Sequence, residues 1–262
     1  MYFAKARFAA SSTVEEIKIG TSHIKWNGGK YAEESFSWLS PVTGEVYGTV
    51  FNFKEQVEEW KGKFYNAPYN EPPKRPVLYI KPRNTINAHL KQIPVPEEID
   101  EVEINGTLGI VIGEMASNVN EKDAFDYVEG YTIVNDVTIP HTSVHRPAIK
   151  NKARDGFCPI GPWVVKKEEI PDPGQFMIWT FKNDELVQVQ QMSDLVKPIP
   201  KLLAEVTEFM TLSKGDVLLV GLPHNPPLAT AGDKVRIEID YLGSLENKIV
   251  DEKAYLPGGT LG

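Results

Sequence analysis

A nearly continuous apolar run, LGIVI at 108–112, constrains the fold of this chain more than any other feature. A strand with one exposed face alternates apolar and polar residues, whereas such a run is typical of a strand buried on both faces. The chain has 262 residues, of which 41% are hydrophobic, so it is long enough for one large domain with a sizeable core. The run therefore predicts a central, fully buried strand.

Strand signals recur along the rest of the chain. Hairpin-type turns are expected at 27–29 (NGG) and 183–184 (ND), and Val-rich strands at 217–220 and 235–241. The spacing of the apolar residues in 199–212 predicts an amphipathic helix. Because strands outnumber helices, we predict a β-dominated α+β chain.

A proline-rich, polar stretch at 66–75 (NAPYNEPPKR) is typical of a linker. It predicts two units, a small N-terminal β-rich segment over residues 1–70 and a main, catalytic domain over residues 71–262. The first strand of the main domain is expected to start near Val77.

The charge and the cysteine content exclude several classes of protein. A net charge of −8 and a pI near 5.3 disfavour nucleic acid and membrane surfaces as partners. A small anionic substrate remains compatible, because a local group of cations can outweigh a distant, screened acidic surface. The one cysteine, Cys158, cannot form an intrachain disulfide and is expected to be buried. The first residues lack the apolar core of a signal peptide and no run has the length of a membrane span, so we expect a cytoplasmic protein.

Several blocks occur in a fixed order along the chain. They are 130–132 (GYT) followed by 135–136 (ND), then 152–162 (KARDGFCPIGP), 211–216 (TLSKGD) and 221–223 (GLP). Together these blocks resemble the signature blocks of the fumarylacetoacetate hydrolase superfamily, which usually has Gly-Thr-Pro in the last of them. The resemblance runs from roughly Val77 to Val250, and several blocks in order are far more specific than any one alone.

The resemblance implies a fold, an activity and partners. The implied fold is the family's mixed β-roll/sandwich, preceded here by the small N-terminal β segment. The blocks 80–85 (IKPRNT) and 146–150 (RPAIK) resemble the first of two tandem copies in the bifunctional decarboxylase/isomerase branch. That branch implies decarboxylation of 5-oxopent-3-ene-1,2,5-tricarboxylate, or isomerisation of 2-hydroxyhepta-2,4-dienedioate, in 4-hydroxyphenylacetate (homoprotocatechuate) catabolism. The implied partners are a small dicarboxylate or tricarboxylate substrate and a second subunit, either identical or paralogous.

The resemblance also implies a divalent cation, Mg²⁺ or Mn²⁺, and no organic cofactor. The family holds its cation with a Glu-x-Glu pair and the Asp of the Asn-Asp block, but Asn105 and Thr107 stand in the Glu positions and only Asp136 remains. A hard cation needs several oxygen ligands. Glu101 and Glu103 face the same side on a continuous strand but lie roughly 13 Å short of these positions. We therefore predict a metal site that is weak or empty.

The chemistry of the implied reaction indicates a catalytic lysine. Loss of CO₂ from a β-keto or vinylogous acid needs positive charge beside the developing enolate. Lys152 can supply that charge or move a proton, with Asp136 and Asp155 setting its pKa and position. A structural Lys–Asp ion pair is the alternative interpretation.

A second catalytic element is incomplete. The resemblance implies a His-x-x-Glu motif shortly after residues 52–53, where this sequence has Gln56 and Glu59. The histidine is thus absent, and Glu59 remains the catalytic candidate. Pro140 replaces an arginine that often follows the Asn-Asp block.

Five side chains are candidates for binding the carboxylates of the substrate. They are Lys81, Arg83, Arg146, Arg154 and Gln188. Arginine suits two-point recognition of a carboxylate, and Gln188 matches a glutamine often near the family's substrate. A solvated strand edge and structural ion pairs are the alternative roles of the basic residues.

Three functions remain open from the sequence. Retention of Lys152 and Asp136 favours an active decarboxylase/isomerase. Loss of the Glu-x-Glu pair and of the histidine favours a non-catalytic subunit that pairs with a ligand-complete paralogue. Hydrolysis or decarboxylation of another 2-oxo acid is the third, because one fold supports several chemistries.

Overall fold

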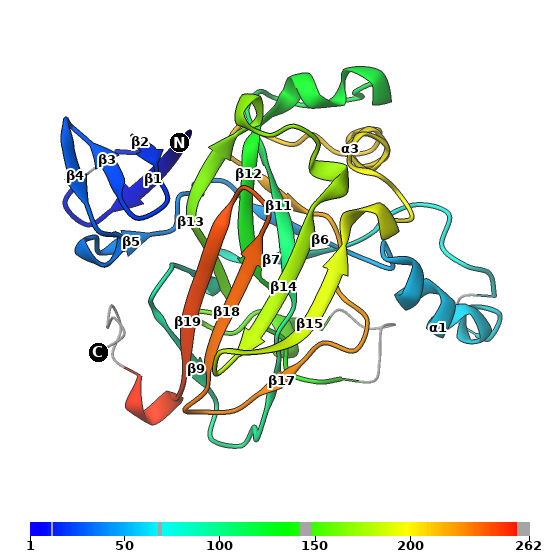
Figure 1. Ribbon diagram of the computed structural model, residues 1–262. Coiled ribbons are helices and arrows are strands. Elements are labelled where there is room, and N and C mark those ends of the chain that lie inside the picture. Colours follow the sequence, from blue (N-terminus) through cyan, green and yellow to red (C-terminus); the bar gives the residue numbers. More distant parts are fainter. Residues whose placement is uncertain (12, 68–69, 142–147, 256–262) are drawn as a thin grey trace.

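The computed structural model describes residues 1–11, 13–67, 70–141 and 148–255 (Figure 1). Arg146, one of the candidate substrate-binding residues, lies outside the described residues. Strands dominate the described chain, as predicted, and they form two larger sheets and one short pair. Among the described residues, no helix has the length and hydropathy that a membrane crossing needs.

The larger sheet has twelve strands, with a main path in the order β4-β3-β2-β1-β13-β12-β11-β16-β6-β7. Outside this path, β5 pairs with β1 and β8 pairs with β13. The strands are β1 (Tyr2–Phe8), β2 (Glu15–Ile19), β3 (Ile24–Trp26), β4 (Gly29–Tyr31), β5 (Trp38–Leu39), β6 (Val46–Val50), β7 (Val77–Lys81), β8 (Ile86–Asn87), β11 (Gly106–Ile112), β12 (Val128–Asn135), β13 (Cys158–Lys166) and β16 (Val217–Leu219).

The second sheet has five strands in the order β15-β14-β18-β19-β9, and β10 pairs with β17. These strands are β9 (Gln92–Val95), β10 (Val102–Glu103), β14 (Met177–Lys182), β15 (Glu185–Gln191), β17 (Leu228–Ala229), β18 (Lys234–Ile239) and β19 (Gly243–Asp251). The α-helices are α1 (Lys54–Phe64), α2 (Ile149–Lys152) and α3 (Ile199–Thr207), and the short 3₁₀ helices include η1 (Glu33–Ser35), η2 (Arg83–Thr85) and η3 (Glu121–Tyr127).

Strand β11 is buried along its whole length, which confirms the prediction from its apolar run. Leu108 and Ile110 pack into the main hydrophobic core, whereas Val111 belongs to a second buried cluster with Val46 and Val217. The main core lies between the two sheets, where β11 packs against β14 and β12 packs against β18 and β19. The strand is therefore covered on both faces, and the ends of the strands around it carry the polar site.

Glycine at position 106 allows the two sheets to approach each other closely. A Cβ atom at Gly106 would lie 3.0 Å from Thr180 Oγ1 and 3.1 Å from Ile237 Cγ2, and both of these atoms belong to the five-stranded sheet. A larger residue would push the sheets apart at the start of β11. The core is thus packed tightly up to the edge of the site.

The N-terminal strands β1–β5 lie together at one side of the molecule (Figure 1). They are joined to the rest through β1, which pairs with β13 in the register Ala4–Val165. Strand β6 and helix α1 precede residue 70, yet β6 pairs with β7 and β16 in the larger sheet. The domain boundary stays a prediction, and this pairing favours a position between β5 and β6 rather than near residue 70.

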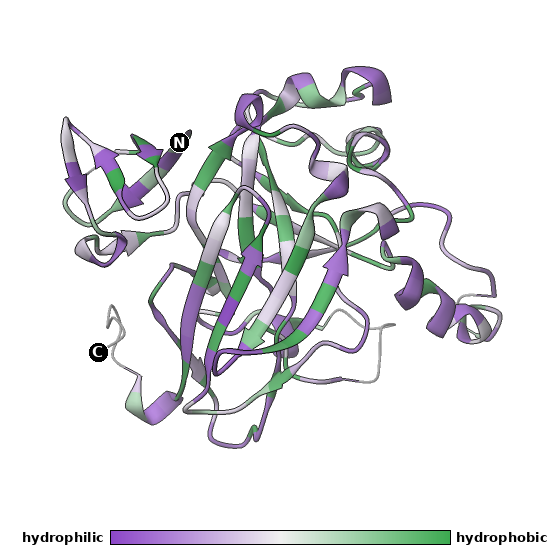
Figure 2. Cartoon of the chain, viewed as in Figure 1, coloured by the Kyte–Doolittle hydropathy of each residue, from purple (hydrophilic) through white to green (hydrophobic). Residues whose placement is uncertain are grey.

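Helix α1 contrasts with the strands in its polarity. Of its residues only Phe64 is buried, and the helix is largely purple in Figure 2, where purple marks hydrophilic residues. A helix with so few buried residues is not a core helix, and its polar face can line an open cavity.

Candidate active site

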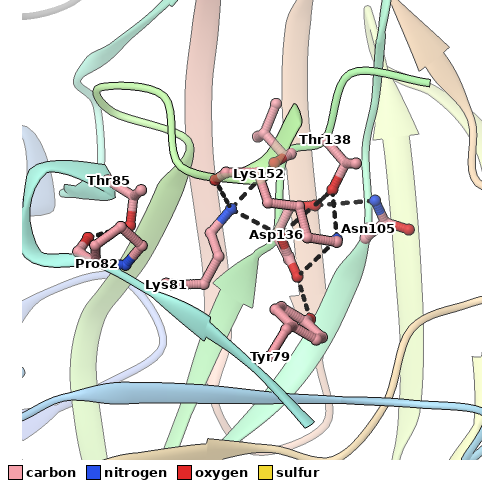
Figure 3. A network of polar contacts seen from close by, with 9 residues as sticks. Tyr79, Lys81, Pro82, Thr85, Asn105, Asp136, Thr138 and Lys152 are labelled. Atoms are coloured by element: carbon pink, nitrogen blue, oxygen red, sulfur yellow. Dashed lines mark hydrogen bonds and ion pairs between the residues drawn. The ribbon is translucent and has the colours of Figure 1, made fainter. Parts of the chain in front are cut away.

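Asp136 directly follows the end of β12 and is the centre of a buried polar network (Figure 3). Its side chain has 0% of its surface exposed. Tyr79 and Lys81 reach it from β7, where their spacing of two residues places both side chains on one face of the strand. Lys152 reaches it from the last residue of α2. Two strand ends and one short helix thus bring two ammonium groups and one phenol to a single carboxylate.

Lys81 uses all three of its N–H groups within the protein. Its Nζ lies 2.8 Å from Asp136 Oδ1, 3.1 Å from the Val137 carbonyl oxygen and 2.8 Å from the Lys152 carbonyl oxygen. A lysine ammonium has three donors, so none remains for a substrate. These contacts favour a role in holding Asp136 and α2 rather than the predicted role in binding substrate carboxylates.

Lys152 retains a free donor. Its Nζ lies 2.7 Å from Thr138 Oγ1 and 3.5 Å from Asp136 Oδ2, and 4.5 Å from the centroid of the Tyr79 ring. Within the described part of the chain, Thr138 and Asp136 are its hydrogen-bond acceptors, so one of its three N–H groups is available to a bound molecule. The Tyr79 hydroxyl donates to Asp136 Oδ2.

The charges in this network fix the state of Asp136. Burial raises the pKa of Asp136, but Lys152 and Lys81 together outweigh it, so the pKa lies below its ordinary value and the group is a carboxylate. Burial lowers the pKa of Lys152, against the opposing effect of Asp136. Burial and the neighbouring carboxylate hold the pKa of Tyr79 well above its ordinary value, so Tyr79 remains a hydrogen-bond donor. One carboxylate between two lysines leaves the network with an excess of positive charge.

A cavity of about 340 Å³ opens beside Lys152. Its inner wall consists of Glu103, Asn105, His141 and Lys152. Its outer wall consists of residues from α1 and from the loop after β16, which lie far apart in the sequence: Gln56, Glu59, Trp60 and Lys63 on α1, and Leu222, Pro223, His224, Asn225 and Pro226 on the loop.

Glu103 is a cavity residue that the sequence did not predict. The expectation that Glu101 and Glu103 lie short of the site assumed one continuous strand. In the structure β10 ends at Glu103 and β11 begins at Gly106, and Glu103 pairs with Thr138 beside Lys152. Burial raises the pKa of Glu103, and the attraction of Lys152 opposes this rise.

The donor set of the site does not fit a divalent cation. Both oxygens of Asp136 are engaged by Lys81, Lys152 and Tyr79. Asn105 Nδ2 donates to the Asp136 carbonyl oxygen at 2.9 Å. Thr107 Oγ1 donates to the Gly221 carbonyl oxygen at 2.6 Å and is turned into the fold. Among the described residues, no three His, Cys, Asp or Glu side chains are grouped as metal ligands.

Three other predicted residues lie away from Lys152. Asp155 is exposed and accepts a hydrogen bond from Asn84 Nδ2 at 2.7 Å. Arg154 donates to the Lys150 carbonyl oxygen at 3.0 Å and lies 3.7 Å from Glu98. Arg83 is exposed on η2. None of these three lines the cavity, and their roles in catalysis or binding stay predictions.

Glu59 and Gln188 both contact the loop of the outer wall. Glu59 Oε2 lies 3.0 Å from His224 Nδ1, and Glu59 Oε1 lies 3.9 Å from Lys63 Nζ. Gln188 Nε2 donates to the His224 carbonyl oxygen at 2.8 Å and to that of Asn225 at 3.2 Å. The loop is therefore fixed between α1 and β15. The motif histidine is absent from the sequence around Glu59, but His224, which is distant in the sequence, lies beside Glu59 in the structure. No local sequence pattern marks His224.

The fumarylacetoacetate (FAA) hydrolase C-terminal domain family matches residues 45–250 of this chain. The chain belongs to this family. Membership confirms the predicted resemblance and the predicted fold. The match begins one residue before β6, so it takes in α1 as well as the two walls of the cavity.

Three known proteins illustrate the likeness. The 4-hydroxyphenylacetate degradation bifunctional isomerase/decarboxylase of Escherichia coli is 37% identical over 212 residues, which are 81% of this chain and 48% of that enzyme. The chain thus spans about half the length of this curated relative. The mitochondrial oxaloacetate tautomerase fahd2 of Xenopus laevis is 37% identical over 246 residues, covering 89% of this chain and 75% of that protein. The crystal structure of 5-carboxymethyl-2-hydroxymuconate delta-isomerase from Mycobacterium smegmatis has a TM-score of 0.77 at 27% identity, covering 96% of this chain and 99% of the other. All three are enzymes named for reactions of small organic acids.

Proposed function

We propose that the chain is a decarboxylase/isomerase of 4-hydroxyphenylacetate (homoprotocatechuate) catabolism. Its substrate would be 5-oxopent-3-ene-1,2,5-tricarboxylate or 2-hydroxyhepta-2,4-dienedioate. The observation that carries the proposal is the Lys152 ammonium, which lines the cavity with one N–H group available to a bound molecule. The 37% identity to the E. coli isomerase/decarboxylase supports this choice of pathway.

The proposed role of Lys152 follows from the charge that develops in both reactions. Decarboxylation and double-bond migration each pass through an enolate next to a carboxylate. A donor held in place beside the enolate oxygen stabilises it by about 3–4 kcal/mol, equivalent to a factor of about 10²–10³ in rate. Asp136 and Thr138 orient the ammonium, and Lys81 holds Asp136 from the other side. The Lys152 N–H group would thus stabilise the negative charge on the enolate oxygen, as a bound cation does in a metal-dependent enzyme.

The decisive experiment removes this charge and keeps the shape of the side chain. Lys152→Met should lower turnover of either substrate by about 100-fold or more, measured by loss of dienol absorbance and by CO₂ release. Lys150→Met is the matched control, because Lys150 lies on the same short helix with an exposed side chain. Full activity of Lys152→Met would remove the proposed catalytic role.

Two alternatives are separated by the same assay. Likeness to the oxaloacetate tautomerase favours a second substrate, so oxaloacetate enol-to-keto conversion belongs in the panel. The commitment of both Asp136 oxygens favours the other alternative, a non-catalytic subunit that completes a paralogue. A chain that is inactive alone on all three substrates, yet raises the activity of a ligand-complete paralogue, would establish that role.

We also propose that the chain works in the cytoplasm as a homodimer or with a paralogous subunit. Strand β15 is an edge of the five-stranded sheet, and its Leu186 and Val189 side chains are exposed. Edge strands with exposed apolar residues favour association. Sedimentation showing a monomer at high concentration, with and without the paralogue, would contradict this proposal.

A further inference from the structure

Glu103 is held in a defined position beside Thr138. The Glu103 amide donates to the Thr138 carbonyl oxygen at 2.8 Å, and the Thr138 amide donates to the Glu103 carbonyl oxygen at 3.2 Å. Residues that exchange both hydrogen bonds across an antiparallel bridge project their side chains to the same face, with Cβ atoms about 5 Å apart. The Glu103 carboxyl is therefore directed to the side on which Thr138 receives Lys152.

Glu103 and Lys152 flank one threonine and line one cavity. Lys152 Nζ lies 2.7 Å from Thr138 Oγ1, and both Glu103 and Lys152 contribute to the cavity wall. The Glu103 carboxyl is attracted by Lys152 and by His141, which also lines the cavity, whereas Lys152 is oriented by Asp136. A fixed cation and a carboxyl group thus line the same cavity.

The other carboxylates near the cavity are committed elsewhere. Glu59, on the outer wall, lies 3.0 Å from His224 and 3.9 Å from Lys63. Asp136 is fully buried, and its oxygens contact Lys81, Lys152 and Tyr79. Among the described carboxylates, Glu103 alone lines the inner wall next to Lys152.

We propose that Glu103 is the catalytic residue that carries the proton between solvent and the reacting carbon, an inference that rests on the proposed function. In isomerisation, the enol O–H bond breaks and its proton passes to solvent, while the carboxyl group of Glu103 adds a proton to the carbon end of the dienolate. The electron pair on oxygen then forms the carbonyl, and solvent returns the lost proton to Glu103. In decarboxylation, the C–C bond breaks, CO₂ leaves, its electron pair forms the enolate beside Lys152, and Glu103 again protonates the carbon. Neither step needs an oxidant or a reductant.

The test separates proton transfer from binding of the enolate. Glu103→Gln keeps the size of the side chain but cannot carry a proton, so kcat for 2-hydroxyhepta-2,4-dienedioate should fall about 100-fold or more. Its KM should change by less than about threefold, because Lys152 still binds the anion. Glu103→Asp retains a carboxyl group one methylene shorter, so its kcat should lie between those of Glu103→Gln and the unmutated chain. Glu101→Gln is the matched control, because Glu101 is exposed two residues earlier and does not line the cavity.

A second measurement guards against misfolding of the variant. Oxalate is a planar mimic of a 2-oxo acid enolate, and its dissociation constant for Glu103→Gln, measured by calorimetry, should stay within about threefold of the unmutated value. Turnover by Glu103→Gln close to that of the unmutated chain would overturn the role of Glu103 and leave the role of Lys152 standing. Weak oxalate binding together with low turnover would also overturn it, because Glu103 would then support the site rather than move a proton. Absence of turnover in the unmutated chain would overturn the proposed function and this inference together.

Discussion

The two walls of the cavity differ in how their polar groups are held. Lys152 on the inner wall and its contacts Asp136 and Lys81 are almost completely buried, with side-chain exposures of 10%, 0% and 0%. On the outer wall, Glu59 and His224 form a contact between groups that remain 45% and 25% exposed. The inner wall is anchored to strand ends within the core, whereas the outer wall is one polar helix and one loop.

This difference separates chemistry from selection of the substrate. A buried network has fixed geometry and a low effective dielectric constant, so its charges act strongly and at one place. The exposed side chains of the helix and of the loop are screened by solvent and can change without loss of the fold. We therefore expect changes on the inner wall to affect stability and rate constants, and changes on the outer wall to affect substrate affinity.

The largest effect should come from removal of the central carboxylate. Asp136→Asn leaves two buried lysines without their counter-charge, and breaking a buried pair in this way costs about 3–5 kcal/mol. The free energy of unfolding, measured with urea, should fall by this amount. Asp155→Asn is the control, because Asp155 is exposed and its loss should cost about 0.5 kcal/mol or less.

The pH dependence of the free energy of unfolding tests the same buried carboxylate in a second way. The pKa of Asp136 in the folded chain lies below its ordinary value of 3.8, which also applies to the unfolded chain. The stability that Asp136 contributes is therefore complete above that ordinary value and is lost as the pH falls towards the lower, folded value. Asp136→Asn should not show this loss of stability at low pH. If the unmutated chain and Asp136→Asn lose the same stability at low pH, other carboxylates cause that loss.

How far the sequence predicted the fold and the site depends on whether the signal was local. The buried strand at 108–112 was predictable because periodicity is a property of neighbouring residues. Contact of Lys152 with Asp136 was also predicted and is present, although the catalytic role of the pair stays a prediction. Asp155 was expected in the same contact, but it lies in an exposed turn and accepts a hydrogen bond from Asn84 instead.

Features that depend on distant pairing could not be predicted. Glu103 reaches the cavity because the strand breaks between β10 and β11, and apolar periodicity carries no sign of that break. His224 meets Glu59 only because α1 and the loop after β16 pack together across more than 150 residues. Lys81 was expected to bind substrate, and only the fold shows that the inward face of β7 points at Asp136.

The next effect in size concerns the outer wall. Trp60 lines the cavity and packs against Phe51, with ring centroids 5.3 Å apart. Trp60→Ala should raise KM about tenfold, equivalent to about 1.4 kcal/mol of binding, with kcat within about threefold of the unmutated value. Trp60→Phe should restore most of the affinity because it restores most of the contact area. A large fall in kcat at unchanged KM would show that the outer wall takes part in the chemistry.

The smallest effect should be the response to divalent cations, because the charges of the inner wall already occupy the place where a cation would bind. A ligand at 100 times its dissociation constant stabilises a folded protein by about 2.7 kcal/mol. We expect Mg²⁺ or Mn²⁺ at millimolar concentration to change the free energy of unfolding by less than about 0.5 kcal/mol, because Lys81 and Lys152 contact Asp136 and repel the ion. Asn105→Asp is the informative variant, since it adds a carboxylate to those of Glu103 and Asp136 and should increase the response. Calorimetric titration gives the direct measurement. Tight, stoichiometric binding to the unmutated chain that disappears in Asp136→Asn would mean that the lysines move aside for a cation, and the difference between the two walls would then depend on the metal.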